Sequence, residues 1–194
     1  MATATPPDTP ELSPAEKADL DRHFSDLYRA HLKDVYSYSY YRIGNHHDAE
    51  DLTEQTFLQA YRHFARARRE SNGRPLKPWL IRIAHNLAAN FHRDRSRKPT
   101  AALDKVEPPA HPHTTDRIAE GKDELRRVLV AIDGLSDDRR EALIMRFALG
   151  MSNPEIAEAL GRTDGATKVL LHRSIKQLEE ILLDGEGGEA ADER

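Results

Sequence analysis

The sequence predicts an all-α protein made of two small helical domains joined by a flexible linker. Apolar residues recur along most of the chain at the spacing of an amphipathic helix, and no segment alternates as a half-buried strand does. One stretch is rich in proline and poor in large apolar residues, so it cannot bury a core and should separate the two domains. The expected segments are a disordered start (1–13), a first domain (14–98), the linker (99–117), a second domain (118–183) and a disordered acidic tail (184–194).

The first domain should contain three helices. One apolar stripe, which includes Leu20, Phe24 and Leu27, predicts a long helix that ends near Gly44. A second helix is expected from His47 to Ala65. After a turn that contains Asn72, Gly73 and Pro75, Pro78 can start the third helix.

The second domain should begin with a helix that ends at Gly134, and Ser136 should cap the next helix, which ends at Gly150. Ser152 and Glu155 have the spacing of a capping box, which predicts a short helix over Asn153–Leu160. Gly161 should end that helix. Thr163 can then cap the last helix, with Thr167, Leu171, Ser174, Leu178 and Ile181 facing inward.

Composition narrows the possible functions. The chain has no cysteine, which excludes disulfides, thiolate metal sites and cysteine nucleophiles. No signal peptide opens the sequence and no apolar run is long enough to span a bilayer, so we expect a cytoplasmic protein without membrane insertion. The net charge of −4 conceals a segregated pattern, because seven basic residues and one acid lie between Arg74 and Lys98. Such a basic segment suits nucleic acid.

A short helix, a glycine turn and a longer basic helix together predict a helix-turn-helix motif, whose second helix enters the major groove of DNA. Arg162 and Thr167 stand where apolar residues are usual, and because threonine has nearly the shape of valine we expect the packing to survive with some loss of stability. The alternative is an ordinary helical hairpin with solvated basic residues. The window NPEIAEALGRTDGATKVLLHRSIK resembles the promoter-reading region four of sigma factors. That resemblance implies contacts with the minus-35 element by Arg162, Thr163, Asp164, Lys168, His172, Arg173 and Lys176.

The run GNHHDAEDLTEQTFLQAYRHF resembles region two of the extracytoplasmic-function (ECF) group of the sigma-70 family, with Glu54 and Gln55 in swapped order. The resemblance implies that this helix docks on the clamp coiled coil of the largest subunit of RNA polymerase core. Its acids would suit a basic partner groove, although the alternative for a charge run is a solvated helix face. The implied core-binding residues are Asp48, Glu50, Asp51, Glu54 and Gln55.

The next motif, PWLIRIAHNLAANFHRDRSRK, resembles the promoter-opening segment of the same family. Unpaired bases need amide hydrogen-bonding groups beside a cationic path, and by family analogy Asn86 lines the pocket for a flipped minus-10 base. A solvated helix position is the alternative for each asparagine. Trp79 should belong to the core. The implied minus-10 contacts are Arg82, Asn86, Asn90, Arg93, Arg95 and Arg97.

Together these motifs imply a sigma factor that binds polymerase core, recognises minus-35 and minus-10 promoter elements and assists DNA melting. It would have no catalytic residue and no cofactor, and an anti-sigma factor is an expected partner. Histidine pairs at 46–47 and 111–113 do not form convergent ligand sets, so no metal site is expected. The rival function is a stand-alone helix-turn-helix transcriptional regulator with an unrelated helical domain.

Overall fold

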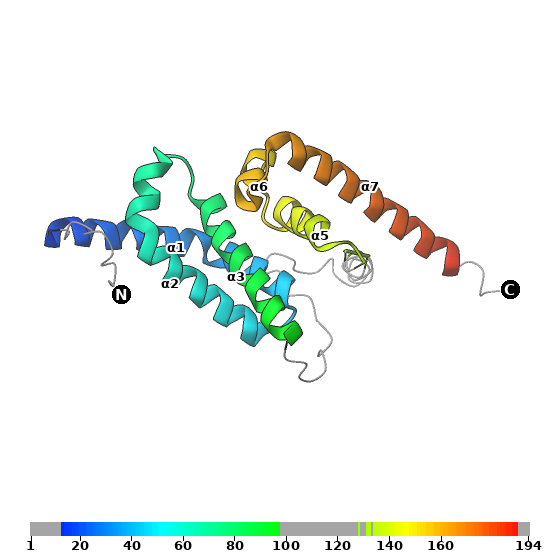
Figure 1. Ribbon diagram of the computed structural model, residues 1–194, viewed down its shortest axis with the longest axis horizontal. Coiled ribbons are helices and arrows are strands. Elements are labelled where there is room, and N and C mark those ends of the chain that lie inside the picture. The colour runs from blue at the N-terminus through cyan, green and yellow to red at the C-terminus, as the bar shows by residue number, and fades with distance from the viewer. Residues whose placement is uncertain (1–12, 98–127, 129–130, 133, 190–194) are drawn as a thin grey trace, which may run out of the picture.

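A computed structural model describes residues 13–97, 128, 131–132 and 134–189. All secondary-structure elements within these ranges are helices. The all-α prediction is therefore confirmed. The first helical group consists of α1 (Pro14–Ile43), α2 (His46–Ser71) and α3 (Lys77–Arg97). The second helical group consists of α5 (Asp137–Leu143), the π-helical turn η1 (Ile144–Ala148), α6 (Asn153–Leu160) and α7 (Asp164–Glu189). Figure 1 shows α5, α6 and α7 together on one side of α1–α3.

Helix α1 ends next to Gly44, as the sequence predicts, and local capping sets both of its ends. The Glu16 carboxylate accepts hydrogen bonds from the backbone N–H and the hydroxyl of Ser13, at 2.9 and 2.7 Å, which satisfies the first turn. At the other end Gly44 takes a left-handed φ of 84°, and its N–H donates to Tyr40 O at 2.8 Å. Glycine adopts this conformation without a steric cost. The tight turn that follows starts α2 directly.

The second helix is longer than predicted. Apolar periodicity stops at Ala65, but α2 continues to Ser71. Its last turns consist mostly of polar residues with good helix propensity and contain an ion pair between Arg66 Nε and Glu70 Oε1 at 2.7 Å. The helix ends only at Asn72, which is left-handed with φ 49°. The third helix begins at Lys77, one residue before the predicted start.

The second group follows the predicted order of helices with two differences. Ser136 occupies the N-cap of α5 but makes no side-chain capping hydrogen bond. The helix predicted to run to Gly150 widens into η1, where Leu149 N–H donates to Ile144 O at 3.2 Å. The Ser152 capping box is present, with the Glu155 carboxylate accepting from Ser152 N at 2.7 Å.

The backbone of α7 stays helical to Glu189, beyond the predicted end at residue 183. Several predicted segments lie outside the described residues. They are residues 1–12, the linker 99–117, most of the predicted helix before Gly134, and residues 190–194. None of the described helices is both long and apolar enough to cross a membrane.

One apolar core extends across both helical groups. It joins side chains of the first group, such as Val35, Leu80 and Ile81, to Met145 and Ile156 of the second group. Trp79 is half-buried and packs against this core, in agreement with the sequence. The sequence predicts two separate domains and gives no indication of this shared core.

Candidate nucleic-acid and protein interfaces

The acidic residues of α2 lie on an exposed face because the opposite face is anchored. Leu52, Thr56 and Phe57 are buried on that opposite face, so this part of α2 has one fixed orientation. Asp48 is half-buried, whereas the other predicted polymerase contacts are exposed: Glu50, Asp51, Glu54 and Gln55. We call the residues Asp48, Glu50, Asp51, Glu54 and Gln55 the acidic face.

The start of α2 stabilises negative charge. Asn45 accepts a hydrogen bond from Asp48 N–H at 2.9 Å, and its amide donates to the Asp48 carboxylate at 2.7 Å. The helix dipole also favours a carboxylate in the first turn. The Asp48 carboxylate is therefore held in place at the start of α2 by Asn45.

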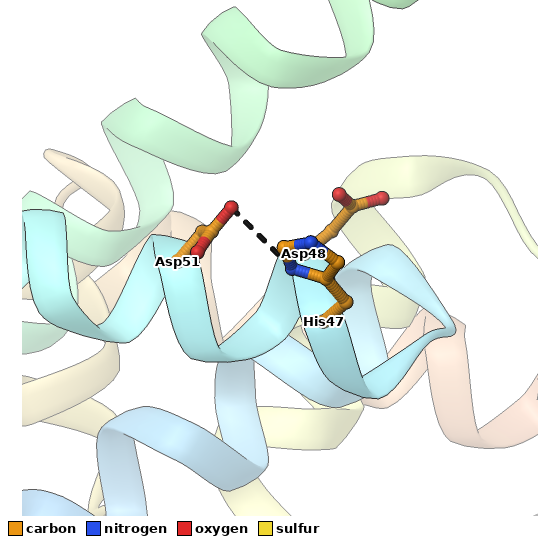
Figure 2. A group of neighbouring side chains, drawn as sticks. All are labelled: His47, Asp48 and Asp51. Carbon is orange, nitrogen blue, oxygen red and sulfur yellow. Dashed lines mark ion pairs between the residues drawn. The ribbon is translucent and has the colours of Figure 1, made fainter.

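Two neighbouring histidines at this helix start turn in different directions, as the sequence predicts. His46 packs on Tyr40 with 4.6 Å between the ring centroids, and its Nδ1 lies 2.5 Å from the Tyr36 hydroxyl. His47 instead approaches the acids, with Nδ1 3.6 Å from Asp51 Oδ2 (Figure 2). A hydrogen bond with its own backbone and the nearby Asp51 carboxylate raise the pKa of His47 above its usual value.

His47, Asp48 and Asp51 each place one ligand atom within 4.8 Å of the others, although the sequence predicts no convergent set here. All three belong to the first turns of α2 (Figure 2), and two of them are exposed. An ion pair four residues apart on a helix is sufficient to explain this arrangement.

The predicted minus-10 residues share one face of α3. Arg82, Asn86, Asn90 and Arg93 are all exposed and lie three or four residues apart. Arg93 Nη2 donates to Asn90 Oδ1 at 2.9 Å, so the amide carbonyl of Asn90 is already engaged. Arg95 and Arg97 belong to α3, but only their backbone is described.

The neighbouring face of α3 is covered by the second helical group. Lys77 Nζ donates to Leu149 O at 2.6 Å, Ile81 is fully buried, and His85 Nδ1 lies 2.8 Å from Glu141 Oε2. His85 stands beside Asn86 in the sequence but faces another element. These contacts are missing from the sequence-based prediction.

Helices α6 and α7 form the predicted helix-turn-helix. Ile156 and Ala157 are buried between the helices, and Gly161 turns the chain with a left-handed φ of 63°. Arg162 N–H donates to Ala157 O at 2.8 Å, which closes the turn. The Thr163 hydroxyl accepts from Ala166 N–H at 3.2 Å and so caps α7, as expected.

Buried residues of α7 hold the helix so that its basic side chains face outward. Thr167, Leu171 and Ser174 are buried, whereas the predicted minus-35 residues are all exposed: Arg162, Thr163, Asp164, Lys168, His172, Arg173 and Lys176. The Arg162 guanidinium donates to Asp138 Oδ2 at 2.5 Å, so it is tied to α5. The Thr167 hydroxyl is buried without a hydrogen-bond partner among the described residues.

Comparison with known proteins identifies the family of this chain. Residues 27–98 match the family model of sigma-70 region 2, and residues 125–178 match that of sigma-70 region 4. The chain is 34% identical to the ECF RNA polymerase sigma factor BldN of Streptomyces coelicolor over 90% of its own length, and it spans 64% of that protein. It is 32% identical to the RNA polymerase sigma factor CarQ of Myxococcus xanthus, with 82% of this chain and 88% of CarQ covered.

A solved structure shows the same arrangement of helices. The sigma factor RpoE of Bartonella quintana, in complex with the anti-sigma factor NepR, aligns with a TM-score of 0.65 and 26% identity. The alignment covers 83% of this chain and 97% of RpoE. The chain therefore belongs to the sigma-70 family of RNA polymerase sigma factors, in its extracytoplasmic-function group.

Proposed function

We propose that this chain binds RNA polymerase core and directs it to promoters, recognising minus-35 and minus-10 elements and assisting DNA melting. In this proposal region two corresponds to residues 14–98 and region four to residues 118–183, and neither performs catalysis. The protein would act in the cytoplasm, where its polymerase and DNA partners are found.

The separation of charge on exposed helix faces carries the proposal. The acidic face on α2 is suited to a basic protein groove, whereas the exposed faces of α3 and α7 present arginine, lysine and amide groups that suit DNA. Each face is backed by buried side chains, so its orientation is fixed before a partner binds.

Transcription from a defined promoter tests the proposal. Purified protein added to active polymerase core should produce transcripts that core alone does not start. A stand-alone regulator would instead bind duplex promoter DNA tightly without core, and a gel-shift assay with and without core distinguishes the two functions. Absence of any stimulated transcript from core of proven activity would exclude the sigma function.

The acidic face can be tested separately. Replacing Asp51 with Arg should weaken core binding at least about tenfold, because a cation then faces the basic groove of the clamp. The Asp26→Arg variant is a matched control, since Asp26 is an exposed acid of α1 outside the acidic face. Equal core affinities of the two variants would remove the acidic face from the proposal.

We also infer an anti-sigma partner, because the related RpoE was solved in complex with NepR. Inhibition of core-dependent transcription by a co-purifying protein, reversed when that protein is removed, would support this inference.

A further inference from the structure

The contact between the two helical groups contains charges that are removed from water. Glu141 of α5 is 3% exposed, and its carboxylate reaches two helices of the first group. Oε1 lies 2.9 Å from Arg42 Nε of α1, and Oε2 lies 2.8 Å from His85 Nδ1 of α3. One acid of the second group is thus enclosed by two nitrogen-bearing side chains of the first.

Neighbouring polar contacts reinforce this one. The Tyr38 hydroxyl lies 3.3 Å from His85 Nδ1, and the adjacent Glu141 charge contributes, after burial itself, to raising the pKa of Tyr38 well above its usual value. Elsewhere in the contact Lys77 Nζ pairs with Asp34 Oδ2 at 3.0 Å while donating to Leu149 O. The two helical groups are therefore aligned by specific polar contacts in addition to apolar packing.

The chemistry of the contact suits a joint that opens. A buried ion pair aligns two surfaces specifically, but its attraction only partly offsets the cost of removing both charges from water. The side chains of Arg42 and Glu141 are both almost fully buried, so both charges are removed from water in the closed arrangement. Opening would return both charges to water and recover their hydration.

The closed arrangement does not fit a promoter. Elements named minus-35 and minus-10 lie about 25 base pairs apart, or about 85 Å along duplex DNA. In the structure Arg82 Nη2, on the proposed minus-10 face, lies only 4.0 Å from the position that a Cβ atom would take at Gly161 in the helix-turn-helix. The two DNA-binding faces cannot reach both elements while the helical groups remain in contact.

We propose that Glu141, Arg42 and His85 form a latch that keeps the free protein closed and that must open before both promoter elements are bound. The need to open rests on the proposed promoter function, whereas the closed state of the free protein does not. The latch therefore adds a conformational cost that polymerase core and promoter DNA must offset together.

A distance measurement tests the latch directly. Because the chain has no cysteine, the substitutions Ser25→Cys in α1 and Leu183→Cys in α7 introduce two unique sites for spin labels, both exposed. Double electron–electron resonance on the free protein should give one narrow distance distribution. Adding Glu141→Gln should introduce a second, broader population, with the open-to-closed ratio raised about tenfold or more.

Two further variants keep the test decisive. Glu179→Gln removes an equally negative but exposed side chain of α7 and should leave the distance distribution unchanged. His85→Ala removes the other half of the latch from a partly exposed position and should open the protein even if Glu141→Gln proves poorly folded by circular dichroism. An unchanged distribution in folded Glu141→Gln or in folded His85→Ala would overturn the latch.

Transcription separates the latch from the sigma function. With core in fixed amount and the protein titrated, Glu141→Gln should reach half-maximal transcript yield at a concentration several-fold lower than the parent protein does. An opened variant with no such shift would refute the role of the latch in promoter binding. If the parent chain starts no transcripts, the proposed function fails, while the distance measurement still decides whether the latch exists.

Discussion

The buried hydroxyl of Thr167 provides a sharp test of the packing in the helix-turn-helix. Thr167 is 0% exposed, and its Oγ1 has no hydrogen-bond partner among the described residues. Burying an unsatisfied hydroxyl costs about 1 to 3 kcal/mol, and valine has nearly the same shape and the same branched Cβ. Thr167→Val should therefore raise the free energy of unfolding by about 1 to 3 kcal/mol. The corresponding rise in Tm is about 2 to 4 °C for each kcal/mol in a chain of this size.

Thr56 is a matched control for this substitution. It is equally buried, but its hydroxyl donates to Leu52 O at 2.7 Å. Thr56→Val loses that hydrogen bond and should lower the free energy of unfolding by about 0.5 to 1.5 kcal/mol. Urea titrations of both variants and the parent protein, followed by far-UV circular dichroism, measure the difference. If Thr167→Val is no more stable than the parent chain, the Thr167 hydroxyl has a partner and the reasoning is refuted.

Three further variants test the proposed DNA contacts and one cap. Replacing Asn86 with Ala should slow open-complex formation about tenfold without changing core affinity, because one hydrogen bond to an unpaired base is lost. Permanganate footprinting over time measures the melting rate, and an unchanged rate would exclude the contact. Arg173→Ala should weaken minus-35-dependent binding of the polymerase complex by about 1 to 3 kcal/mol, and a template without a minus-35 element is the control, which should respond little. Hydrogen bonds from Ser152 hold the pKa of Glu155 below its usual value, so the stabilisation is present above the unfolded-state pKa and is lost as the pH falls through the folded-state pKa. Glu155→Gln should consequently flatten the acid side of the stability–pH curve, and parallel acid limbs in the two proteins would contradict the role of this cap.

Helix ends could be predicted wherever the sequence carries a local signal. Gly44, Gly161 and the Ser152 capping box each specify a backbone conformation or a hydrogen bond within a few residues, and the structure has helix ends at all three. The last turns of α2 were not predicted because they carry no apolar periodicity, and only helix propensity and the Arg66–Glu70 ion pair support them. The change from α-helix to π-helix at Ile144–Ala148 has no comparable signal in the sequence.

Exposure of the candidate site residues could also be predicted, because it follows from the apolar stripe on the opposite face of each helix. Lys168 and His172 are exposed since Leu171 and Ser174 occupy the buried side of α7. The engagement of Arg162 by Asp138 could not be predicted in this way, because the two residues belong to different helices whose relative placement is set by tertiary packing.

The burial of Glu141 could be predicted from the sequence, but its partner could not. The residue precedes Met145 by four positions and therefore lies on a helix stripe that also includes Leu149, both of which are buried. An acid on an apolar stripe indicates burial, and a buried carboxylate requires partners. The sequence carries this indication of burial. However, the preceding Arg139 and Arg140 favour the opposite interpretation, a solvated start of the helix. Its partner Arg42 could not be named, because the two residues are brought together only when the second helical group packs on the first, and no local pattern in the sequence specifies that packing. The sequence thus predicts each half of a promoter-binding protein, and the contact that would restrain both halves is visible only in the folded chain.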